Sequence, residues 1–179
     1  SFNAVLFFTG FIFLLWYYSH RLKKHLFVGN ISAALLSVMP LFVLVVYYRN
    51  FDAIILVHAS FLLLLLVLRE IIKDLENLKG DLAQNYRTIP VVYGEREAKY
   101  WASLVVGLTY VPTIILLTNY PIGDMRYYFY ATIVLLALFL LLLWRAEDKK
   151  HYLMLHALLR LAIVLGVGSI ILLDSAHFQ

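Results

Sequence analysis

The sequence predicts an all-α membrane protein with six transmembrane helices, and three observations support this fold class. Hydrophobic residues make up 63% of the 179 residues and the mean hydropathy is +0.84, whereas a soluble domain is nearer half apolar. The apolar residues form long continuous runs that do not alternate with polar ones, which favours helices over a β-barrel. Lys and Arg gather between the runs, in alternate loops.

The apolar runs follow one another with short polar connections. A bilayer core of about 30 Å needs roughly 20 mostly apolar residues per helix. Six runs meet this requirement, and in chain order they are 2–18, 30–48, 52–71, 98–118, 126–144 and 153–173. Since no long linker or soluble segment separates them, we expect residues 1–179 to form a single transmembrane helical domain.

The basic residues indicate an orientation in the membrane. The loops 19–29, 69–99 and 145–152 hold twelve Lys and Arg residues, whereas the two alternate loops hold only Arg49 and Arg126. By the positive-inside rule the three basic loops are cytoplasmic. Six spans then leave both ends of the chain outside, which we expect if an odd number of helices precedes them. A net charge of +4 reflects this loop asymmetry, so we expect no nucleic-acid partner.

A dense polar segment, REIIKDLENLKGDLAQNYRTIPVVYG at 69–94, continues from the third run. It contains four acidic and four basic residues. If the helix continues at 3.6 residues per turn and weakens near Gly80, four oxygen-bearing residues fall on one face: Glu70, Asp74, Asn77 and Asp81. Mg²⁺ prefers a few carboxylate oxygens together with water and substrate phosphates. The alternative interpretation is a solvated helix end in which Lys73 pairs with Glu70 or Asp74.

This segment resembles the second aspartate-rich motif of the UbiA superfamily of intramembrane prenyltransferases. The matching order is Arg-Glu, Lys-Asp, an acidic cluster, Gly-Asp, then Arg-Thr, Pro and Gly, and it is most similar to geranylgeranylglycerol-phosphate geranylgeranyltransferase-like members. The loop YYSHRLKKHLFVGN, at 17–30, is similar to that family's Tyr-Ser…Leu-Lys…Gly-Asn stretch. The resemblance implies a nine-helix fold, of which this chain is the last two-thirds. Three preceding helices would carry the first aspartate-rich motif, because no Asn-Asp…Asp…Asp pattern occurs before residue 69.

The resemblance also implies which residues hold the ligands. Family members bind an allylic diphosphate through Mg²⁺, and an acceptor captures the carbocation that remains when the diphosphate leaves. The two Asp of the family motif map to Asn77 and Asp81, so an amide replaces one carboxylate, and Asp74 compensates better than Glu76. We therefore expect Asp81, Asn77 and Asp74 to hold the metal, with Asp81 and Asp74 catalytic. The diphosphate would contact basic and tyrosine side chains, namely Lys23, Arg87, Tyr18 and Lys73.

Two hypotheses for function remain open. The first is Mg²⁺-dependent transfer of a prenyl group from an isoprenyl diphosphate to a lipophilic or membrane-surface acceptor, either a glycerol phosphate or an aromatic or quinone precursor. The second is a non-catalytic scaffold or subunit of a membrane-protein complex, which Asn77 and the missing first motif favour. Either protein would be a multi-pass protein of the lipid bilayer, and we expect a prokaryotic cytoplasmic membrane.

Overall fold

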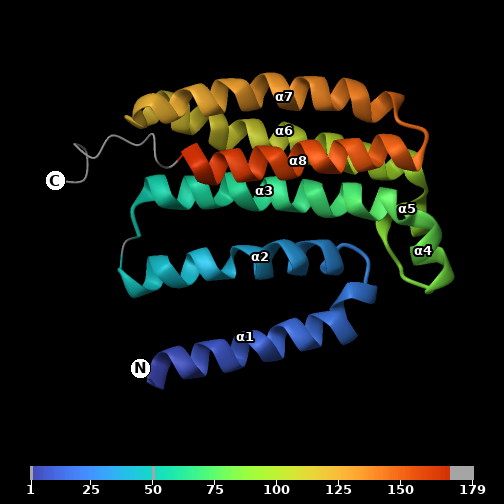
Figure 1. The fold of residues 1–179 in the computed structure, drawn as a ribbon, viewed down its shortest axis with the longest axis horizontal. Coiled ribbons are helices and arrows are strands. Elements are labelled where there is room, and N and C mark those ends of the chain that lie inside the picture. Colours follow the sequence, from blue (N-terminus) through green and yellow to red (C-terminus); the bar gives the residue numbers. More distant parts are fainter. Residues whose placement is uncertain (1, 50, 170–179) are drawn as a thin grey trace.

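The computed structural model describes residues 2–49 and 51–169, and six long helices dominate this part of the chain (Figure 1). They are α1 (Phe2–His20), α2 (Val28–Tyr47), α3 (Ala53–Glu76), α6 (Glu95–Asn119), α7 (Arg126–Arg145) and α8 (Lys149–Gly168). All six are long and apolar enough to cross a membrane. The predicted fold class and the six predicted spans are therefore confirmed. The third helix runs past the predicted end at 71, and the predicted end of the last span at 173 lies outside the described residues.

Short elements occupy the connections between the long helices. They are η1 (Leu22–Lys24), α4 (Leu78–Ala83), α5 (Ile89–Tyr93) and η2 (Gly123–Met125). The first three lie at the same end of the molecule as the turn between α7 and α8 (Figure 1). Backbone and side-chain bonds join these loops, because Arg87 N–H donates to the Lys24 carbonyl at 3.4 Å and Lys99 Nζ donates to the Ala146 carbonyl at 2.5 Å. The three basic loops of the sequence therefore share one end of the bundle.

The packed core lies around α3. This helix packs against α6, α8 and α2, and its buried residues Leu65, Leu68 and Ile72 join the core that Phe129 and Leu155 also form. The α1 and α2 helices lie to one side of the other four (Figure 1), and α1 packs against η1 and α2. Exposed apolar faces are compatible with lipid, because lipid tails are as apolar as the side chains themselves. The last turns of α3 thus stand between the main core and α2.

Candidate functional site

A cavity of about 200 Å³ lies at the basic end of the bundle, where α1, η1, α2, α3 and α4 meet. We call this cavity the polar pocket. Its lining residues come from five separate stretches of the chain: Tyr18, Lys23, Gly29, Asn30, Glu70, Lys73, Asp74, Asn77, Asp81, Tyr86 and Thr88. The site is therefore assembled by the fold and not by the polar segment alone.

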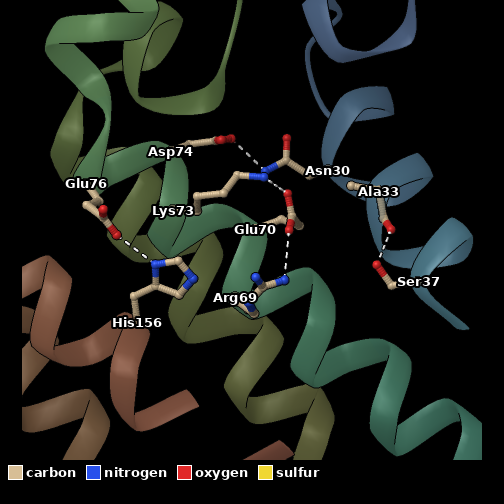
Figure 2. A network of polar contacts seen from close by, with 9 residues as sticks. All are labelled: Asn30, Ala33, Ser37, Arg69, Glu70, Lys73, Asp74, Glu76 and His156. Carbon is tan, nitrogen blue, oxygen red and sulfur yellow. Dashed lines mark hydrogen bonds and ion pairs between the residues drawn. The ribbon is translucent and has the colours of Figure 1, made fainter. Parts of the chain in front are cut away.

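Two buried carboxylates project from the last turns of α3. Glu70 is 6% exposed and Asp74 is 8% exposed. Glu70 is paired with Lys73 one turn later, and its Oε1 lies 3.4 Å from Arg69 Nη1 (Figure 2). A buried charge is costly unless a partner compensates it. The Glu70 charge is thus compensated within α3, as the salt-bridged interpretation of this helix end allowed.

Asp74 has a partner on another helix. Asn30, in the first turn of α2 and 7% exposed, donates from Nδ2 to Asp74 Oδ2 at 2.7 Å (Figure 2). The neighbouring Gly29 lets α2 begin close to η1, because a Cβ there would lie 3.1 Å from the Lys23 carbonyl oxygen. These contacts hold the start of α2 and the η1 loop against the carboxylate face of α3. Asn30 is part of the 17–30 motif, but the sequence alone predicts no role for it.

The helix breaks between the carboxylates, and not near Gly80 as expected. α3 ends at Glu76, Asn77 has φ −100° and ψ 12°, and Gly80 lies inside the short helix α4. The Asn77 N–H still donates to the Lys73 carbonyl at 3.0 Å, and the Asp81 N–H donates to the Asn77 carbonyl at 2.9 Å. Because these bonds keep the helical spacing through the break, Asn77 and Asp81 line the same pocket as Asp74.

Asp81 stands among basic and hydroxyl groups. Burial raises the pKa of its carboxyl above the usual value, and the neighbouring Thr88 hydroxyl and the Lys23 and Lys73 ammonium groups oppose this rise. Thr88 is buried, and its Oγ1 has no hydrogen-bond partner among the described residues. The Thr88 hydroxyl therefore lies near the Asp81 carboxyl without forming a hydrogen bond to it. Lys23 Nζ lies 5.0 Å from the centre of the Tyr86 ring. The pocket therefore places cations beside a partly buried carboxylate.

The structure brings together most, but not all, of the predicted site residues. Those that line the polar pocket are Tyr18, Lys23, Lys73, Asp74, Asn77 and Asp81. Arg87 is exposed and does not line it, although its backbone contacts the η1 loop. Glu76 also lies outside the pocket, where its Oε2 is 2.7 Å from His156 Nδ1 on α8. Three further lining residues were not predicted, namely Asn30, Tyr86 and Thr88, because each reaches the pocket only through the packing of separate elements.

The donor atoms decide what kind of metal the pocket could accept. Asp74, Asn77 and Asp81 offer carboxylate and amide oxygens, which are the ligands of hard cations such as Mg²⁺. Within residues 2–49 and 51–169 there is no group of three or more His, Cys, Asp or Glu that could hold a metal ion. The residues therefore fit an ion that shares its coordination with a phosphate ligand and water, and do not form a closed protein cage.

The chain is similar to one family of known proteins. The profile of the UbiA prenyltransferase family matches residues 1–164. The digeranylgeranylglyceryl phosphate synthase of Thermococcus gammatolerans is 34% identical over 152 residues, which are 84% of this chain and 54% of that protein. The synthase of the same name from Thermococcus kodakarensis is 29% identical over 152 residues, covering 84% of this chain and 53% of that protein.

A methanogen protein gives a shorter match. The digeranylgeranylglyceryl phosphate synthase of Methanothermobacter thermautotrophicus is 38% identical over 106 residues, which are 54% of this chain and 35% of that protein. The chain thus spans about half the length of the first curated relatives that it matches. No solved structure matches it.

Proposed function

The chain belongs to the UbiA prenyltransferase family, and from this premise we propose that its polar pocket binds the diphosphate of an isoprenyl donor together with Mg²⁺. The prenyl group is then transferred to a lipophilic acceptor at the membrane surface. The observation that carries this proposal is the convergence of Asp74, Asn77 and Asp81 with two lysines in one cavity at the end of apolar helices. A diphosphate needs cations, and its prenyl chain needs an apolar surrounding.

The reaction is a substitution at the first carbon of the prenyl group. The bond from this carbon to the diphosphate oxygen breaks, and the electron pair leaves with the diphosphate. An acceptor hydroxyl oxygen forms the new bond to carbon, and its proton passes to the released diphosphate. Lys23 and Lys73 place positive charge where the leaving group develops negative charge. A bound Mg²⁺, held by Asp74, Asn77 and Asp81, would add Lewis-acid stabilisation of the same oxygens.

The acceptor is proposed from the relatives. Their names describe the synthesis of digeranylgeranylglyceryl phosphate, a glyceryl phosphate with two geranylgeranyl groups. This favours geranylgeranyl diphosphate as donor and geranylgeranylglyceryl phosphate as acceptor over an aromatic or quinone precursor. The chain is an integral multi-pass membrane protein, and the basic loops around the polar pocket favour its placement on the cytoplasmic side.

The non-catalytic alternative has one specific observation in its favour. The position of one motif carboxylate is occupied by Asn77, so the pocket offers only Asp74 and Asp81 beyond the Glu70 that Lys73 already pairs with. A protein retained as a scaffold or complex subunit would keep the fold and tolerate this loss. Activity measurements separate the two functions.

The test uses the full-length protein, purified and reconstituted into liposomes. Radiolabelled geranylgeranyl diphosphate and geranylgeranylglyceryl phosphate are supplied with Mg²⁺, and the transfer of label to the lipid product is followed. We expect product with Mg²⁺, none after treatment with EDTA, and recovery when Mg²⁺ is restored. No product with this acceptor, with aromatic acceptors or with other prenyl donors would favour the scaffold.

A further inference from the structure

The Glu76–His156 contact lies directly beside the polar pocket but does not belong to it. Glu76 Oε2 is 2.7 Å from His156 Nδ1, and the two side chains are 13% and 11% exposed. An ionised carboxylate only accepts hydrogen bonds, so the imidazole Nδ1–H donates. His156 Nε2 is buried without a hydrogen-bond partner among the described residues, which makes the Glu76 bond the polar contact that orients the ring.

The position of Glu76 gives this bond its importance. Glu76 is the last residue of α3, and the next residue, Asn77, forms the break before α4. In Figure 2 the Glu76–His156 bond and the Asn30–Asp74 bond lie on opposite sides of α3. The end of α3 is therefore held from one side by α2 and from the other by α8.

Across the break itself, two backbone hydrogen bonds keep the helical spacing, and α4 also packs against α5. Side-chain contacts of α4 add little to this. The caps of α4 include no side-chain hydrogen bond, and a Cβ at Gly80 would meet nothing within 4 Å, so α4 is loosely enclosed on that side. Asn77 is itself exposed. A six-residue helix has little stability of its own. The direction in which α4 leaves α3 therefore depends on how firmly the last turn of α3 is held.

We infer that Glu76 and His156 form a positioning pair for the polar pocket. Their bond fixes the end of α3 against α8, and so sets the orientation in which Asn77 and Asp81 face Asp74. The ligand consequences of this inference rest on the proposed function, whereas the positioning itself does not. A partner that orients ligands from outside the site commonly changes metal affinity about 10-fold to 100-fold when it is removed.

The first measurement needs no ligand. Single cysteines replace Lys79, exposed on α4, and Lys150, exposed at the start of α8, in a full-length protein free of other cysteines, and spin labels report the distance between them. We expect a narrow distance distribution in the parent and a broader or shifted one in Glu76→Ala and in His156→Ala. An unchanged distribution in both variants would overturn the inference.

Two conservative variants separate positioning from general packing. His156→Asn places an amide donor near the position of Nδ1, whereas His156→Gln places it near Nε2. We expect the parent distribution in His156→Asn and the broadened one in His156→Gln. Glu97→Ala, which removes an exposed carboxylate at the same end of the molecule, is the matched control and should change nothing. If both His variants behave like His156→Ala, the ring acts by packing and the inference fails.

The second measurement links the pair to the pocket. Mn²⁺ replaces Mg²⁺ as a spectroscopic probe, and its binding in the presence of inorganic diphosphate is titrated by electron paramagnetic resonance. We expect about 10-fold weaker binding in Glu76→Ala and parent-like binding in His156→Asn. A broadened distance distribution with unchanged Mn²⁺ affinity would overturn the inference that the pair positions the ligands of the polar pocket. If even the parent binds no Mn²⁺, the proposed function fails. The distance measurement then tests by itself whether Glu76 and His156 position the end of α3.

Discussion

The two ends of α3 meet their surroundings by different kinds of contact. At its C-terminal end, in the polar pocket, charged and amide groups pair within α3 and with α2. Near its N-terminal end, a cavity of about 230 Å³ is lined mainly by aromatic and aliphatic side chains from α2, α3, η2, α7 and α8, and Asp52 and His58 also line it. There Phe61 and Tyr128 each place a ring centre 5.2 Å from that of Phe129. We call this second cavity the apolar cavity.

This difference in contacts indicates that the two ends of α3 control different properties of the protein. Hydrogen bonds and ion pairs depend on direction and on the identity of one partner, so the polar pocket is sensitive to single atoms. Ring packing depends on volume and shape, so the apolar cavity is sensitive to added or lost bulk. Substitutions in the polar pocket should therefore change ligand binding and turnover, and substitutions around the apolar cavity should change stability.

The largest expected effect concerns the sides of the membrane that the two ends face. Cysteines placed at Lys79, near the polar pocket, and at Asp124, near the apolar cavity, should react with an impermeant reagent from opposite sides, because the positive-inside rule predicts that the basic loops stay on the cytoplasmic side. Labelling of intact and of inverted vesicles measures this directly. Arg96→Cys should behave like Lys79→Cys. Reaction of positions 79 and 124 from the same side would contradict the orientation.

Loss of the Asp81 carboxylate should have the next largest effect. If the full-length protein is the proposed enzyme, Asp81→Ala should lower turnover by about 10²-fold to 10³-fold, because one electrostatic contact to a developing charge is worth roughly 3–4 kcal/mol. Membrane insertion and thermal stability should stay close to those of the parent. Asp124→Ala, which removes an exposed carboxylate at the other end, is the control. Near-normal turnover in Asp81→Ala would remove Asp81 from the site.

The sequence predicted the polar pocket in part, and the reason lies in the range of the contacts. Asp74, Asn77 and Asp81 share a helical face, so their spacing was enough to bring them together even though the helix breaks between them. The partners of this face were not predictable in the same way. Asn30 is 44 residues from Asp74, and His156 is 80 residues from Glu76. No local pattern contains such pairings.

Arg87 stays a prediction. Its place in the motif and its charge favour a phosphate ligand, but Arg87 is exposed and does not line the polar pocket, whereas the next residue, Thr88, is buried and lines it. The six apolar helices, in contrast, were predictable because hydrophobic length alone defines them. Fold class therefore followed from composition, whereas the membership of the site depended on packing.

A smaller effect is expected where α7 and α8 meet beside the apolar cavity. A Cβ at Gly166 would lie 2.6 Å from the Tyr128 hydroxyl, which donates to the Ala162 carbonyl at 3.0 Å. Gly166→Ala must displace this ring, and we expect it to cost about 1–3 kcal/mol of stability. A lower midpoint of thermal unfolding in detergent, with unchanged turnover per folded molecule, would show it. Gly168→Ala, where a Cβ meets nothing within 4 Å, is the matched control.

The smallest expected effect comes from restoring a charge to the polar pocket. Asn77 is exposed, so an aspartate there would keep its hydration, and Lys23 and Lys73 line the same cavity. The new carboxylate would repel Asp74 and Asp81 when no metal is bound and would attract the metal when one is present. Because exposed charges interact by at most about 1 kcal/mol, Asn77→Asp should shift Mg²⁺ affinity by a factor of about five or less.

This substitution also distinguishes two roles for the native amide. If Asn77 contributes an oxygen to the metal, Asn77→Asp should reach half-maximal rate at a lower Mg²⁺ concentration, with turnover equal to or above that of the parent. Gln84→Glu adds the same charge to an exposed position of the same segment, outside the pocket, and should leave the Mg²⁺ dependence unchanged. A fall in both turnover and Mg²⁺ affinity would mean that the pocket requires a neutral amide, and that Asp74 and Asp81 alone carry the charge that faces the metal.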